Sequence, residues 1–215
     1  MRIVRLDPPR GRWGDQRVTF ADGTRLRVRS ADIAALGLAE GDEVGDDALA
    51  TLRLQDAIAG ARVFAYRLLA IRPRSRHEML TRLQMRRVPP SATGQLLDEL
   101  ERDGLLDDAR FARLWIDGRV AHRPAGAVRL RAELRRKGID RRVIDDAVND
   151  RLDPEDEAAL ALAAARTLAR RYQTADRKTA YRRLAAALER RGFSTHVIIS
   201  TLAQILGTPP DAAQP

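Results

Sequence analysis

The chain has 215 residues and a formal net charge of +9, with 39 lysines and arginines against 30 aspartates and glutamates. It contains no cysteine, which excludes disulfides, thiolate metal sites and cysteine nucleophiles and suits a reducing compartment. The N-terminus lacks the apolar segment of a signal peptide, and no stretch is long and apolar enough to cross a bilayer, so we expect a cytoplasmic protein.

Residues 1–46 are predicted to form a small β unit. Asp22 and Gly23 lie between two runs rich in β-branched residues, which is a strong hairpin signal. The segment Leu38–Val44 is predicted to supply a turn and one more short strand. From Ala48 onward the residues are typical of helices, and the alternation of a strand does not return.

The helical part repeats one pattern three times. Leu83–Val88, Leu134–Ile139 and Leu188–Phe193 align without gaps as a leucine, basic residues and a large apolar residue, at spacings of 51 and 54 residues. The second and third copies carry a glycine before the apolar residue, which suits the left-handed position that ends a helix. The first copy has Arg87 there, so we expect its turn to be the least regular.

Capping residues indicate where the helices of each copy begin. Each copy is expected to hold one helix that ends at the repeated pattern, one that starts just after it, and one that precedes both. The expected N-caps are Ser75, Asp107, Asp140, Asp153 and Ser194. The helical part is thus expected to consist of three repeats, residues 47–105, 106–152 and 153–207. The tail, residues 208–215, is expected to be disordered.

The predicted fold is mainly α. It consists of tandem three-helix repeats, each resembling a helix-turn-helix unit, after the small N-terminal β unit. Because such small units stack on their neighbours, we expect an elongated, curved molecule.

The most specific string in the sequence runs from Gly104 to Ala112, Gly-Leu-Leu-Asp-Asp-Ala-Arg-Phe-Ala. Physical reasoning alone assigns it a helix end, an aspartate cap and a new helix whose aromatic residue enters the core. The string also resembles the G-L-[IL]-[DN]-D-x-x-[FY]-A hallmark of the RecX family, and Arg72–Glu78 and Arg129–Ile139 resemble two further RecX segments. We expect structural roles for the motif residues Gly104, Leu105, Leu106, Asp107, Asp108, Phe111 and Ala112.

The resemblance implies a regulator that binds the RecA recombinase and its nucleoprotein filament and mostly inhibits ATP hydrolysis, coprotease activity and strand exchange in DNA recombination, repair and the SOS response. Aromatic residues make up only 4% of the chain and most lie at core positions, so we expect little stacking on bases and only weak, backbone-directed binding to single- and double-stranded DNA without sequence specificity. We expect a monomer with no membrane partner and no small-molecule substrate.

Positive charge collects toward the C-terminal part of the chain. Residues 1–60 carry 9 basic and 10 acidic groups, residues 61–120 carry 12 and 8, and residues 121–192 carry 18 and 11. Basic residues recur near corresponding helix ends, and as a set they are the candidates for contacting DNA or the filament. These candidates are Arg82, Arg86, Arg129, Arg135, Arg136, Lys137, Arg141, Arg142, Arg182, Arg183, Arg190 and Arg191.

Two alternatives to a filament regulator stay open. The first is a helix-turn-helix regulator that acts on DNA directly, which is disfavoured because Asn149 is the only asparagine available for reading bases. The second is an adaptor that scaffolds other proteins.

The sequence contains no recognisable catalytic residues. His77, His122 and His196 lie in different repeats, and the sequence has no H-E-x-x-H, phosphate-loop or G-x-S-x-G motif. We therefore expect no enzyme activity, no cofactor and no metal.

Overall fold

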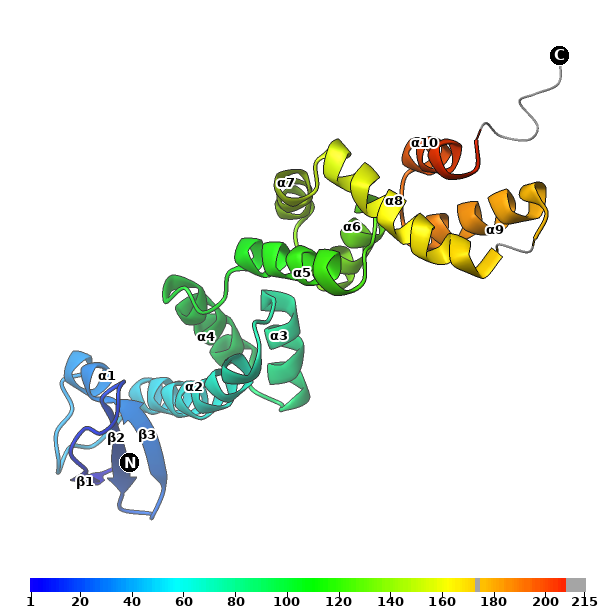
Figure 1. Ribbon diagram of the computed structural model, residues 1–215. Helices are drawn as coiled ribbons and strands as arrows, with labels where there is room; N and C mark the ends of the chain where they lie inside the picture. Colours follow the sequence, from blue (N-terminus) through cyan, green and yellow to red (C-terminus); the bar gives the residue numbers. More distant parts are fainter. Residues whose placement is uncertain (173–174, 208–215) are drawn as a thin grey trace. The chain divides into compact units, whose positions relative to one another are not determined.

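The computed structural model describes residues 1–172 and 175–207 and divides into two compact units, Met1–Leu106 and Asp107–Pro215. The expected disordered tail, residues 208–215, lies outside the described residues. No helix in the described part of the chain is both long and apolar enough to span a membrane. The predicted mainly α fold, with three three-helix repeats and a small β unit, is confirmed (Figure 1).

The first unit begins with a three-stranded antiparallel sheet in the order β1-β2-β3. Its strands are β1 (Ile3–Leu6), β2 (Asp15–Phe20) and β3 (Arg25–Arg29), and the predicted hairpin joins the last two around Gly23, whose φ is 86°. A short helix, α1 (Ser30–Ala35), follows the sheet.

The prediction of a strand within Leu38–Val44 is wrong. This segment forms only one isolated bridge, between Glu43 and Arg2, and the third strand is β1, which pairs with β2 through Ile3 and Phe20. A turn at Gly41, whose φ is 95°, limits the segment to a few backbone hydrogen bonds with Met1 and Ile3, which are too few to form a strand.

One long helix links the sheet to the first repeat. α2 (Asp46–Ile71) buries Leu49 and Leu52 against the sheet and, further along, packs Ile58 and Ala65 against α3 (Arg76–Met85) and α4 (Pro90–Arg102). Its Arg62 is 1% exposed and donates two hydrogen bonds of 3.0 Å to Glu99 of α4.

The second unit holds the other two repeats. Repeat two consists of α5 (Asp108–His122), α6 (Ala127–Arg136) and α7 (Arg141–Arg151). Repeat three consists of α8 (Pro154–Ala169), a 3-10 turn η1 (Arg170–Tyr172), α9 (Arg177–Arg190) and α10 (Thr195–Leu206). Each repeat encloses a core of its own.

The local signals in the sequence mark these helices accurately. A side-chain oxygen of each predicted N-cap accepts a backbone N–H in the first turn of its helix, as at Ser75, Asp107, Asp140, Asp153 and Ser194. Within the Gly104–Ala112 string, Gly104 has a φ of 67°, and the apolar residues Leu106, Phe111 and Ala112 are buried.

The turns of the repeated pattern share one backbone geometry and differ in the residue that adopts it. Gly138 and Gly192 end α6 and α9 with φ values of 74° and 79°. Arg87 ends α3 with a φ of 59°, and among the described residues it is the only non-glycine residue with a positive φ. The turn of repeat one therefore has the same geometry as the others but uses a residue that is strained there.

Candidate functional site

Repeats two and three meet through the backbone of α6 and of the turn between α9 and α10. Gly126 donates its N–H to the carbonyl of Arg191 at 2.9 Å, and Val128 donates to the carbonyl of Gly192 at 3.2 Å. A carboxylate oxygen of Glu157 accepts a hydrogen bond of 2.8 Å from the N–H of Ala127. The first N–H groups of α6 have no partner within the helix, so repeat three supplies the cap that α6 itself lacks.

Two glycines make this contact possible. A side chain at Gly126 would collide with the carbonyl group of Gly192, and one at Gly192 would collide with the backbone of Arg129. The glycine of the repeated pattern therefore ends α9 and also lets α6 approach closely.

A buried carboxylate organises the arginines beside this contact. Glu133 of α6 is 5% exposed and accepts hydrogen bonds from Arg119 at 2.7 Å, Arg129 at 2.9 Å and the indole N–H of Trp115 at 3.0 Å. Burial alone would raise the pKa of Glu133, but these hydrogen bonds outweigh it and hold the pKa below its usual value. The carboxylate therefore stays ionised and keeps two guanidinium groups in place.

A hollow of about 480 Å³ opens at this contact between the repeats. Its polar lining consists mainly of basic side chains, and neither Arg123 nor Arg191 has an ion pair with another described residue. These basic side chains are Arg119, Arg123, Arg129 and Arg191, and the imidazole of His122 lines the hollow beside them.

A second basic hollow is lined mainly by residues of α9. Its volume is about 390 Å³, and it is lined by Arg182, Arg183, Arg190 and Tyr172 with no acidic residue. The guanidinium of Arg183 lies 5.8 Å from the centre of the Tyr172 ring. Arg190 lines this hollow and the next residue, Arg191, lines the first; we call the basic residues of the two hollows together the junction surface.

The structure thus brings together five of the predicted candidates. Arg129, Arg182, Arg183, Arg190 and Arg191 all belong to the junction surface. Arg129 also has a structural function, because it donates a hydrogen bond of 3.1 Å to the carbonyl of Arg190.

A second group of candidates lies at the other end of α6 and the start of α7. Arg135, Arg136 and Arg142 are exposed, Arg141 pairs with Asp145 at 3.6 Å, and Lys137 lies 4.6 Å from the centre of the Trp115 ring. None of these residues lines the two hollows.

The remaining candidates, Arg82 and Arg86, lie in the other compact unit. Both are exposed, and Arg86 lies 4.8 Å from the centre of the Phe64 ring. Their part in binding stays a prediction.

Sequence reasoning missed Arg119, His122 and Arg123. These residues form the last turn of α5 and the residue after it, and a run of basic residues just before Pro124 could have indicated them. They were overlooked because they lie outside the repeated pattern. They line a hollow only because residues of repeat three pack beside them.

The chemistry of the junction surface suits phosphate groups. Guanidinium groups donate in a planar fork that matches phosphate oxygens, and the exposed arginines here outnumber the one buried carboxylate that pairs with them. Among the described residues, no group of three histidine, aspartate or glutamate side chains could hold a metal ion.

Family models match all three repeats. Residues 61–100 match the first three-helix domain of RecX, residues 107–148 the second and residues 155–202 the third.

Several curated proteins are similar over most of this chain. The regulatory protein RecX of Streptomyces coelicolor is 34% identical over 152 residues, which are 71% of this chain and 80% of that protein. The regulatory protein RecX of Thermobifida fusca is 38% identical, over 65% of this chain and 75% of its own length. The corresponding protein of Mycobacterium marinum is 39% identical, over 66% and 85%.

Solved structures extend the similarity to the fold. A crystal structure of a regulatory protein RecX superposes with a TM-score of 0.77 at 25% identity and covers 91% of this chain and 96% of its own. RecX from Lactobacillus salivarius gives a TM-score of 0.65 at 21% identity, over 70% of this chain and 97% of its own.

Proposed function

This chain belongs to the RecX family of regulatory proteins, and on that premise we propose that it binds the RecA nucleoprotein filament and inhibits its ATP hydrolysis, coprotease activity and strand exchange. It acts in the cytoplasm during DNA recombination, repair and the SOS response. It works as a monomer, without a cofactor and without a catalytic reaction of its own.

The junction surface is the observation that carries this proposal. A filament of protein on DNA exposes phosphates, and two hollows lined by arginines in repeats two and three offer donors for them. Such contacts neutralise phosphates and read no base edges, which fits weak binding to single- and double-stranded DNA without sequence specificity.

Several arginines of this surface are held in position before a partner binds. Glu133 accepts hydrogen bonds from Arg119 and Arg129, and the backbone contact between the repeats sets the position of Arg191 relative to both. Less conformational entropy is then lost when the surface engages its partner.

The test is the rate of ATP hydrolysis by the cognate RecA on single-stranded DNA, with this protein added in substoichiometric amounts. We expect the rate to fall, and we expect the Arg182→Glu/Arg190→Glu variant to require a higher concentration for the same fall. Arg110→Glu/Arg151→Glu changes the net charge equally outside the junction surface and serves as the control. An unchanged rate together with tight binding to duplex DNA would instead support a regulator that acts on DNA directly.

A further inference from the structure

The outward face of the sheet in the N-terminal β unit concentrates positive charge. The strand register places Arg17 directly opposite Arg27, and Thr19 lies between Arg25 on one side and Arg5 on the other. Like charges directly opposite each other destabilise a sheet. A local arrangement that opposes stability in this way is typical of a functional surface.

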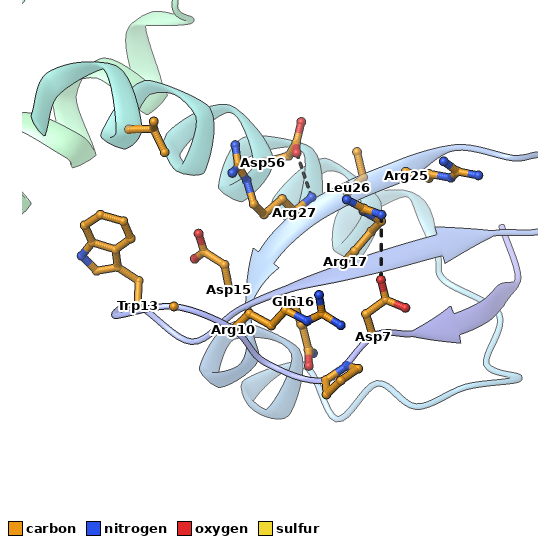
Figure 2. A pocket seen from close by; sticks show the side chains of 13 residues that line it. Asp7, Arg10, Trp13, Asp15, Gln16, Arg17, Arg25, Leu26, Arg27 and Asp56 are labelled. Carbon is orange, nitrogen blue, oxygen red and sulfur yellow. Dashed lines mark hydrogen bonds and ion pairs between the residues drawn. The ribbon is translucent and has the colours of Figure 1, made fainter. Parts of the chain in front are cut away.

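A hollow of about 630 Å³ lies on this face (Figure 2). Strands β2 and β3 form its floor, and α2 contributes Asp56 and Val63 as a wall. The rim is the loop that carries Arg10 and Trp13. This loop is closed by a hydrogen bond of 2.8 Å from the N–H of Arg10 to the carbonyl of Asp15.

The three carboxylates that line the hollow already have partners. Asp7 pairs with Arg5 at 2.7 Å and Arg17 at 4.0 Å. Asp56 accepts the backbone N–H of Arg27 at 2.8 Å. The third, Asp15, faces the buried guanidinium of Arg62 at 3.6 Å.

Three guanidinium groups are left for an outside anion. Arg10, Arg25 and Arg27 are exposed, line the hollow and form no ion pair with any other residue that the structure describes. They come from the rim loop and from β3, so an extended chain of phosphates could contact them in succession.

Trp13 adds an aromatic side chain to the rim. It is half-buried, packs edge-on against Tyr66 with ring centres 4.8 Å apart, and has the guanidinium of Arg62 5.6 Å from its ring centre. These contacts fix the indole at one end of the hollow that the arginines line (Figure 2). An aromatic ring next to a basic groove is the arrangement that holds single strands, because only unpaired bases can stack on it.

We propose that this face of the β unit, with Arg10, Trp13, Arg17, Arg25 and Arg27, is a binding site for single-stranded DNA. The strand contacts the arginines through its phosphates and places a base against the exposed part of Trp13. This site lies outside the three repeats and does not require RecA.

The intrinsic fluorescence of Trp13 tests the proposal directly. The chain has two tryptophans, so Trp115→Phe leaves Trp13 as the only indole, and Trp13→Phe is its counterpart. An oligothymidylate titrated at low salt should quench Trp115→Phe saturably and should quench Trp13→Phe much less. In the Trp115→Phe background, Arg25→Ala/Arg27→Ala should weaken binding and lower the slope of log K against log salt by about 0.7 for each lost phosphate contact.

Arg2→Ala/Arg53→Ala is the matched control, because both are exposed arginines of the same unit that do not line the hollow. It should bind like the parent, and circular dichroism of each variant checks folding. Oligothymidylate that binds by anisotropy without changing Trp13 emission, and with equal affinity for Arg25→Ala/Arg27→Ala, would overturn the proposal. Equal quenching by polyglutamate or by a duplex would also contradict it. None of these outcomes depends on whether the protein inhibits RecA.

Discussion

At the residue scale, Gly126 and Gly192 determine how repeat three packs on repeat two. A side chain added at either position would collide with backbone atoms of the other repeat. Overpacking of this kind costs about 1–3 kcal/mol. We expect Gly126→Ala to lower the free energy of unfolding of the second unit by about 2 kcal/mol.

Urea unfolding followed by circular dichroism measures this loss. Gly118→Ala is the control, because Gly118 lies within α5 and a methyl group there would meet no atom within 4 Å. It should raise stability by up to about 1 kcal/mol, since alanine favours a helix over glycine. Equal effects of the two substitutions would contradict the close approach.

Glu133 links stability to pH. Its pKa is lowered in the folded protein, where hydrogen bonds from three side chains outweigh the effect of burial. Its ionised form therefore contributes stability above the ordinary glutamate pKa of about 4.3, and that contribution is lost as the pH falls through the lower folded value.

We expect Glu133→Gln to reduce the free energy of unfolding by about 2 kcal/mol at neutral pH. The difference from the parent should shrink as the pH falls below about 4. Denaturation curves across this range measure it, with Glu189→Gln on the exposed face of α9 as the control. A difference independent of pH would show that the charge of Glu133 contributes no stability.

At the scale of elements, the turn after α3 has the same geometry as the other two but holds a strained residue. Arg87 occupies the left-handed position where the other repeats have glycine, and an L-residue there costs about 1–2 kcal/mol. Arg87→Gly should stabilise the first unit by up to about 1 kcal/mol, because the greater freedom of glycine in the unfolded chain offsets part of the gain.

The midpoint of thermal or urea unfolding measures this gain. The control is Gln84→Gly, one turn earlier within α3, which should destabilise by about 1 kcal/mol. If Arg87→Gly also destabilised the protein, the side chain of Arg87 would have to make contacts that outweigh its backbone strain.

Elements with local signals could be predicted from the sequence. The N-caps and the turns depend on residues a few positions apart, so their patterns are legible before folding. Strand β1 was missed because its pairing with β2 joins segments more than ten residues apart.

At the scale of the whole molecule, the distribution of charge in space differs from its distribution along the chain. Residues 1–60 carry nearly balanced charges, yet the sheet places its arginines on one face and leaves several acids at the turns. Summing charges by segment therefore hid this basic surface.

The candidate site was likewise only partly predictable. Arg190 and Arg191 were found through the repeated pattern, but their proximity to Arg123 depends on backbone contacts between repeats. Such contacts leave no periodic signal in a single sequence. The junction surface depends on the packing of repeats two and three, and this packing could not be predicted from the sequence.

If the junction surface binds the RecA filament, its arginines should determine the affinity of the protein for preformed RecA filaments on fluorescently labelled single-stranded DNA, which can be measured by anisotropy. Arg123→Glu/Arg191→Glu should bind weakly and with a smaller dependence on salt, whereas Arg110→Glu/Arg151→Glu should bind like the parent. Equal affinity of all three proteins would contradict a role for the junction surface in filament binding.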